Sequence, residues 1–104
     1  ILDENQIKEN DERVYVIYFD ETKEYAMKAI NSLRENGIRI DFDYNAKSFP
    51  TQMKKANRIN AKYILIAGTD EMEQNKITIK NFETGKQELL DLQEITEIIV
   101  NKNI

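Results

Sequence analysis

The sequence has no cysteine and no histidine. Without cysteine the chain forms no disulfide and offers no thiolate nucleophile or zinc–thiolate site. Without histidine it lacks Ser–His and Cys–His catalytic pairs and the commonest ligand of transition metals. These two absences exclude the corresponding kinds of catalytic centre, and the lack of cysteine fits a cytoplasmic protein.

Long apolar runs and phosphate-cradling loops are also missing. No run approaches the roughly 20 apolar residues that a membrane-spanning helix needs, so no membrane partner is expected. Neither GxxxxGK[ST] nor GxGxxG occurs. The length of 104 residues, with 40% hydrophobic and 33% charged residues, fits one soluble globular domain. We interpret the polar residues 1–12 as a linker remnant and residues 13–104 as that domain, which suggests a fragment of a longer protein.

Acidic residues are absent from a stretch of 26 residues, from Tyr44 to Thr69. The net charge of the chain is −4, and this stretch alone carries +5, so the remainder carries −9. An acidic protein with one basic segment is typical of contact with a local anionic partner. The positive charges of the segment come from Lys47, Lys54, Lys55, Arg58 and Lys62.

The hydrophobic pattern predicts an α/β fold with the element order β-α-β-α-β-β-β-α. Two right-handed crossovers place the first strand between the second and third, and a final hairpin extends the sheet beyond the third. The result is a mixed five-stranded sheet flanked by three main helices on both faces. The predicted strands are residues 13–19, 38–42, 62–67, 76–80 and 86–90; the helices start near residues 22, 48 and 91, and residues 68–74 form a loop.

Local signals support these boundaries. Asp20-Glu21-Thr22 is the predicted capping segment of the first helix, Ser48 caps the second, and Asp91 with Glu94 forms a capping box for the third. Asn75 stands where a positive φ is expected. The buried stripe of the second helix is predicted to be Phe49, Met53, Ala56 and Ile59, which leaves Lys54, Lys55 and Arg58 towards solvent.

Four carboxylates follow the predicted parallel strands and raise the question of a divalent-metal or phosphoacceptor site. They are Asp20, Asp43, Asp70 and Glu71. A receiver domain needs its phosphoacceptor at the end of the third strand, where this chain has Ala67-Gly68-Thr69. Carboxylates without histidine, cysteine or a glycine-rich loop are weak evidence for catalysis. We therefore predict no catalytic residue and no metal site.

The basic helix has two interpretations. Its charges can form a solvated face that balances acidic neighbours, or they can contact nucleic acid. Aromatic and amide side chains in the adjoining loops favour RNA, because single-stranded RNA is recognised by stacking and by hydrogen bonds to splayed bases. Tyr44, Asn45, Glu71 and Lys80 fit such contacts, whereas Phe49 fits the core better.

The stretch AKYILIAGTDEME, from Ala61 to Glu73, is followed by Ile77-Thr78-Ile79-Lys80. It resembles the anticodon-binding domain of class IIa aminoacyl-tRNA synthetases, where a Gly-x-x-Glu loop precedes a strand that ends in a basic residue. The sequence QMKKAN, from Gln52 to Asn57, with Glu83-Thr84-Gly85 in the hairpin, is most similar to histidyl-tRNA synthetase. The likeness covers roughly residues 14–99.

The resemblance implies a C-terminal domain that binds the anticodon loop of histidine tRNA and performs no chemistry. The parent enzyme would be a cytoplasmic homodimer that activates histidine with ATP and Mg²⁺ in a separate catalytic domain; no cofactor is implied for this domain. A backbone contact is implied at Ala46, and Lys80 stands for an arginine in relatives. Together, the residues of the predicted tRNA site are Tyr44, Asn45, Ala46, Lys47, Lys54, Arg58, Glu71 and Lys80.

Two alternatives stay open. One is the same domain from a threonyl, prolyl or glycyl enzyme. The other is a non-catalytic paralogue that keeps the fold as a regulatory or protein-binding module.

Overall fold

The computed structural model describes residues 13–45 and 48–101. The predicted linker at residues 1–12 lies outside them. The elements in chain order are β1 (Val14–Tyr18), the 3₁₀ helix η1 (Asp20–Thr22), α2 (Lys23–Glu35), β2 (Ile40–Phe42), α3 (Phe49–Arg58), β3 (Tyr63–Ala67), α4 (Thr69–Gln74), β4 (Ile77–Asn81), β5 (Gln87–Leu90) and α5 (Leu92–Asn101).

The five strands form one mixed sheet in the order β2-β1-β3-β4-β5, which confirms the predicted topology. β1 pairs in parallel with β2 and with β3. β4 pairs antiparallel with β3 and with β5. β2 has only three residues and pairs with the first three of β1, so the last two residues of β1 have no strand beside them on that edge.

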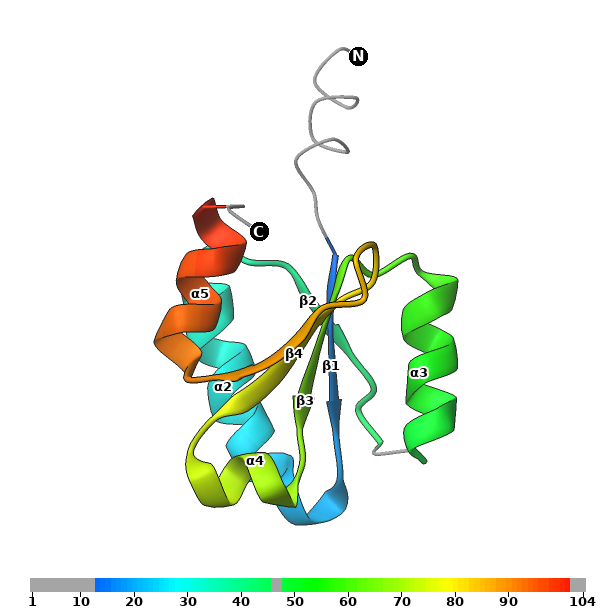
Figure 1. Ribbon diagram of the computed structural model, residues 1–104. Coiled ribbons are helices and arrows are strands. Elements are labelled where there is room, and N and C mark those ends of the chain that lie inside the picture. Colours follow the sequence, from blue (N-terminus) through cyan, green and yellow to red (C-terminus); the bar gives the residue numbers. More distant parts are fainter. Residues whose placement is uncertain (1–12, 46–47, 102–104) are drawn as a thin grey trace.

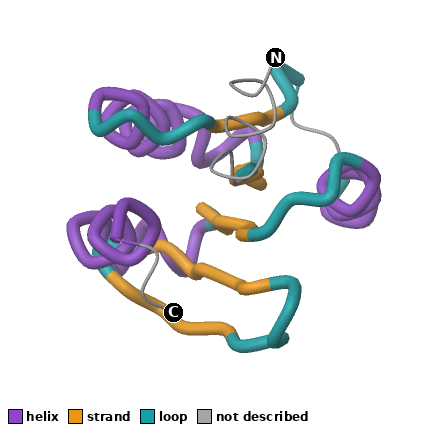
Figure 2. Tube along the Cα trace, turned by 90° about the horizontal axis from the view of Figure 1, so that it is seen from above, coloured by secondary structure: helices purple, strands orange, loops and turns teal. Residues whose placement is uncertain are grey.

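Helices cover both faces of the sheet (Figure 1). Seen from above, α2 and α5 lie together on one side and α3 lies alone on the other (Figure 2). The core is divided in the same way. The larger cluster joins Ile30, Leu33 and Ile95 to one face of the sheet, and the smaller joins Ala56 to the opposite face through Tyr15 and Ile64.

The segment after β3 differs from the prediction. Residues 68–74 were expected to be a loop, but Thr69–Gln74 forms α4. Its N-cap is Gly68, and it ends at Asn75, whose φ of 59° confirms the predicted left-handed conformation. A helix of six residues carries too little apolar periodicity to be recognised in a sequence, so this prediction was wrong.

The segment predicted to cap the first helix does precede α2, with Thr22 as the N-cap residue. Asp20 itself makes no capping bond, because Asp20–Thr22 forms η1, and the hydroxyl of Thr22 accepts from the backbone N–H of Phe19 at 3.1 Å. The predicted capping box of α5 is confirmed, because Asp91 Oδ1 accepts from Glu94 N at 2.8 Å and Glu94 Oε1 accepts from Asp91 N at 3.3 Å.

The cap of α3 is confirmed, but its predicted buried face is partly wrong. Ser48 Oγ accepts from Thr51 N at 3.4 Å. Phe49 is 39% exposed and does not belong to the core. The fully buried polar residue of this helix is Gln52, at 0% exposure.

Gln52 completes the open edge of β1. Its Oε1 accepts from Tyr18 N at 3.2 Å, and its Nε2 donates to Tyr18 O at 2.8 Å. The side-chain amide thus makes the pair of bonds that a longer β2 would supply. Backbone groups buried without partners are costly, so Gln52 fixes α3 against the end of β1.

Replacement of Gln52 by leucine is expected to lower the free energy of unfolding by about 2 kcal/mol, because both backbone groups of Tyr18 lose their partner in a buried place. Urea unfolding measures the change. Asn57→Ala, at an exposed position of the same helix, is the control and should stay within about 0.5 kcal/mol of the unaltered chain. Equal stability of the Gln52→Leu variant would contradict this role.

Candidate nucleic-acid interface

The carboxyl ends of the three parallel strands meet at one edge of the sheet, where open α/β sheets commonly bind ligands. η1 follows β1 there, the segment from Asp43 follows β2, and α4 follows β3 (Figure 1). α4 packs against η1 and against β4. The edge therefore gathers two of the regions predicted for tRNA contact: Tyr44 and Asn45 after β2, and Glu71 in α4.

Glu71 is tied to two neighbouring strands. Its Oε1 accepts from the backbone N–H of Gly68, at the end of β3, at 2.9 Å. Its Oε2 accepts from the hydroxyl of Thr78, in β4, at 2.8 Å. The first bond caps α4. The residue is half-buried, and both oxygens of its carboxylate are held by hydrogen bonds.

The approach of Glu71 explains the glycine at position 68. A Cβ there would lie 2.9 Å from Glu71 Oε1 and 3.4 Å from Cε2 of Phe19. Gly68 has a φ of −95°, which other residues adopt readily, so the requirement is space and not backbone conformation.

Tyr25 borders the same carboxylate from α2. Its hydroxyl donates to Lys76 O at 2.6 Å. Burial, and then the negative charge of Glu71, raise the pKa of the Tyr25 hydroxyl. The negative charge of Glu71 therefore disfavours ionisation of the neighbouring Tyr25 hydroxyl.

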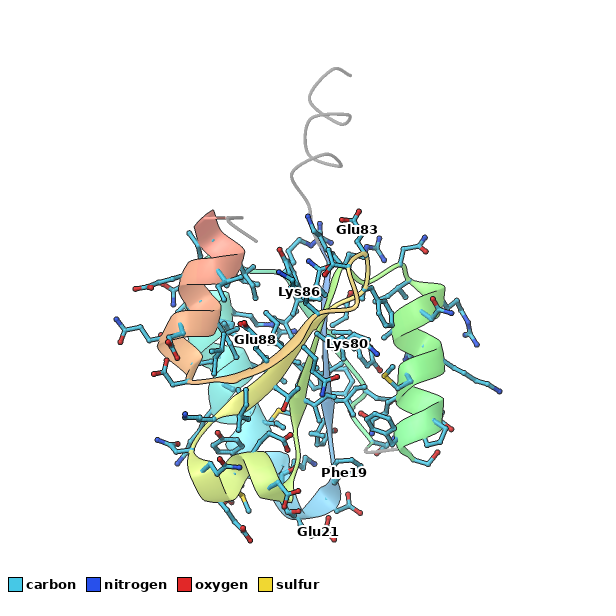
Figure 3. All side chains as sticks on the ribbon, in the orientation of Figure 1. Phe19, Glu21, Lys80, Glu83, Lys86 and Glu88 are labelled. Atoms are coloured by element: carbon cyan, nitrogen blue, oxygen red, sulfur yellow. The ribbon has the colours of Figure 1, made fainter. Side chains whose placement is uncertain are left out.

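Lys80 lies on the same face of the sheet as Thr78, because alternate residues of a strand point the same way. It pairs with Ile64, a member of the core cluster under α3, so this is the face that α3 partly covers (Figure 3). Two residues of strand place Lys80 about 7 Å from Thr78 along β4. Lys80 is half-buried, with its ammonium 5.9 Å from the ring centroid of Phe82.

Tyr44 is the most exposed aromatic side chain among the described residues, at 75%. Its ring centroid lies 4.9 Å from that of Phe42. Phe42 in turn meets Tyr18 edge-on at 6.3 Å and lies 5.4 Å from the Arg34 guanidinium. A ring supported from behind and open in front is suited to stacking on a base. Phe42 was not predicted as part of the site.

Lys54 and Arg58 are exposed on α3, as predicted. They are four residues apart and so lie on the same side of the helix. Arg58 is the last residue of α3, at the end remote from the segment that follows β2 (Figure 1). The Lys55 ammonium lies 4.0 Å from Asp43 Oδ2, which makes part of the basic charge internal to the domain.

The structure describes the position of all but two of the residues predicted for the site. Asn45 is exposed and follows Tyr44. Ala46 and Lys47 lie outside the described residues. The prediction missed Phe42 and Thr78. The signal of Thr78 in the sequence is a single polar residue between Ile77 and Ile79, on the sheet face opposite to that of the isoleucines.

Comparison with known proteins decides the family. The family model described as "Anticodon binding domain" matches residues 13–102. The chain belongs to the anticodon-binding domain family. The fold expected from the resemblance to class IIa synthetases is therefore confirmed.

Individual relatives agree with this assignment. A histidine–tRNA ligase of Staphylococcus saprophyticus is 39% identical over 98 residues, which are 90% of this chain and 23% of that protein. The structure of apo histidyl-tRNA synthetase from S. aureus matches with a TM-score of 0.75 at 37% identity, over 88% of this chain and 24% of that one. This anticodon-binding domain thus spans about a quarter of the length of these relatives.

A third match concerns the fold alone. The RNA binding domain of threonyl-tRNA synthetase from Cryptosporidium parvum Iowa II has a TM-score of 0.79 at 22% identity, over 88% of this chain and 23% of that one.

The four carboxylates considered for a metal site do not gather. Within the part of the anticodon-binding domain that the structure describes, no three Asp or Glu side chains are placed so that they could hold a metal ion. Over the same residues, no helix is both long and apolar enough to cross a bilayer.

Two buried tyrosines of β1 differ in their hydroxyl groups. Tyr18 Oη donates to the backbone carbonyl of Asp43 and so anchors the segment that carries Tyr44. Tyr15 Oη is buried and has no hydrogen-bond partner among the described residues. Burial, with smaller contributions from Asp43 and Asp41, raises the pKa of Tyr15 to about 12.

Phenylalanine substitutions at the two positions are expected to act in opposite directions. Near pH 7, Tyr18→Phe should lower the free energy of unfolding by about 1 kcal/mol, and Tyr15→Phe should raise it by about 1 kcal/mol because a buried unpaired hydroxyl is removed. Urea unfolding of the two variants tests this, and a destabilised Tyr15→Phe variant would contradict it.

The pH dependence gives a second measurement. The unfolded chain loses the Tyr15 proton near pH 10 and the folded chain near pH 12. The folded state binds more protons between these values, so stability falls as the pH rises from 10 to 12. Tyr15→Phe should lessen that fall. An unchanged slope would show that other groups cause it.

Proposed function

We propose that this domain recognises the anticodon loop of histidine tRNA as the C-terminal domain of a histidine–tRNA ligase. The observation that carries the proposal is the 39% identity with a histidine–tRNA ligase over 90% of the chain. The longer enzyme would be a cytoplasmic homodimer, and its catalytic part would bind ATP and Mg²⁺ and esterify histidine to the tRNA. This domain would supply tRNA binding and no catalytic group.

The side chains at the strand ends support contacts with bases. Tyr44 offers an exposed ring for stacking, and Asn45 beside it offers amide donors and an acceptor. The Glu71 carboxylate can accept from base amino and imino groups, and the Lys80 ammonium can donate to base acceptors or to a phosphate. Ala46 and Lys47 remain proposed contacts.

The charges around the site indicate from which side RNA approaches. Asp20, Glu21, Asp70 and Glu73 are all exposed on η1 and α4, so that part of the edge repels phosphates. The exposed Lys54 and Arg58 lie on the other side of the sheet, on α3. We infer that the RNA backbone lies along α3 and that its bases turn towards Tyr44, Glu71 and Lys80.

The test compares two kinds of variant. Lys54→Gln combined with Arg58→Gln should weaken binding to every stem-loop several-fold, and should reduce the slope of log affinity against log salt by about 1.5, because two phosphate contacts are lost. Glu71→Gln should instead reduce discrimination between the histidine anticodon stem-loop and an anticodon-swapped one by about ten-fold. Fluorescence titration of the domain at low and moderate salt measures both quantities.

Matched controls come from the opposite face. Lys23→Gln combined with Lys28→Gln removes two positive charges from exposed positions of α2 and matches the double variant of α3. Glu97→Gln removes one negative charge from an exposed position of α5 and matches Glu71→Gln. Neither should alter affinity or discrimination as much as the site variants. Swapped stem-loops with threonine, proline and glycine anticodons test the alternative synthetases, since preference for one of them would replace histidine in the proposal. Equal weak binding to all stem-loops would favour the non-catalytic paralogue.

A further inference from the structure

Each oxygen of the Glu71 carboxylate accepts a hydrogen bond from within the domain. Gly68 N donates to one oxygen and Thr78 Oγ1 to the other, at 2.9 and 2.8 Å. The terminal torsion of a glutamate side chain is broad and soft, so the cap bond from Gly68 alone would let the carboxylate plane turn. The second bond, from a different strand, defines the orientation of that plane.

Thr78 is well placed to give this orientation. It lies inside β4, paired with Ile66 on one side and Leu89 on the other, and is 7% exposed. Its β-branched side chain has restricted χ1 freedom. The position of the hydroxyl is therefore set by the sheet, and its hydrogen bond fixes the orientation of the Glu71 carboxylate relative to the sheet.

The bonded carboxylate still has capacity for a ligand. Each ionised oxygen accepts about two hydrogen bonds, and each has one described bond within the domain. Because the residue as a whole is only half-buried, we infer that the remaining lone pairs can accept from the N–H donors of a ligand. The two internal hydrogen bonds thus leave both Glu71 oxygens able to accept a further bond, in a carboxylate of defined orientation.

We propose that Thr78 is a positioning residue for specificity: its hydroxyl orients the Glu71 carboxylate towards the N–H groups of an anticodon base. The assignment rests on the proposed function, and it adds a residue that touches no RNA. Specificity depends on the direction of an acceptor as much as on its presence, because a misdirected hydrogen bond is weak.

Thr78→Val and Thr78→Ser separate this role from a structural one. Valine keeps the β-branched shape and suits a strand, but it removes the donor; serine keeps the donor. Thr96→Val is the matched control, because the Thr96 hydroxyl donates to Leu92 O on α5, at 2.8 Å, and lies outside the site. Thermal unfolding of each variant verifies that it is folded.

The measurement is the ratio of affinities for the histidine anticodon stem-loop and an anticodon-swapped one. Thr78→Val is expected to reduce the ratio about ten-fold, with weak binding to both stem-loops retained, whereas Thr78→Ser and Thr96→Val keep the ratio of the unaltered chain. An undiminished ratio in Thr78→Val overturns the assignment, as does an equal loss in Thr78→Ser. If the unaltered chain shows no discrimination, the proposed function itself fails, and that failure is visible before any substitution is made.

Hydrogen exchange of the Gly68 amide gives a readout that needs no RNA. If Thr78 orders the carboxylate, its loss loosens the bond from Gly68, so exchange should become several-fold faster in Thr78→Val and remain unchanged in Thr78→Ser. Unchanged exchange in Thr78→Val would also overturn the assignment.

Discussion

The parallel pairing of β1 with β3 determines how the other strands and helices of the domain are arranged. Both strands are buried along most of their length, and they pair over five residues from Val14 with Tyr63 to Tyr18 with Ala67. Since both faces are apolar, helices must cover both. The pairing also brings η1 and α4 together at one edge, which is where the proposed site lies.

Two side chains extend the order of this central pair to the segments around it. Gln52 replaces the missing end of β2 and fixes α3 to β1. Glu71 links the end of β3 to β4 through Gly68 and Thr78. Both are partly or fully buried polar side chains, and both polar atoms of each terminal group make a hydrogen bond. The segments of the proposed site are therefore attached to helices and strands that these hydrogen bonds fix to the sheet.

Much of the fold follows from local patterns in the sequence. The strand order comes from the crossovers and the hairpin, and the caps at Ser48 and Asp91 follow from the residue types that capping requires. The left-handed conformation at Asn75 follows from the residue type, because asparagine tolerates a positive φ better than most residues. These features depend on residues close in sequence, which is why they could be predicted.

The misses depend on partners distant in sequence. Gln52 is buried because the last residues of β1 lack a strand beside them, and no pattern within α3 shows this. Phe49 has the apolar character of a core residue, but it is the first residue of α3 and is 39% exposed. α4 is short, and the bond from Glu71 to Thr78 that ties it to β4 appears only once the strands are paired.

Chemical-shift mapping with an anticodon stem-loop locates the bound RNA on the domain without any substitution. We expect the largest shifts of backbone amide signals at Tyr44, Asn45, Glu71, Lys80 and the exposed side of α3. Signals from α2 and α5, on the other face of the sheet, should move little. If the shifts concentrate on α2 and α5 while the signals of Glu71 and Lys80 do not move, RNA does not bind at the proposed interface.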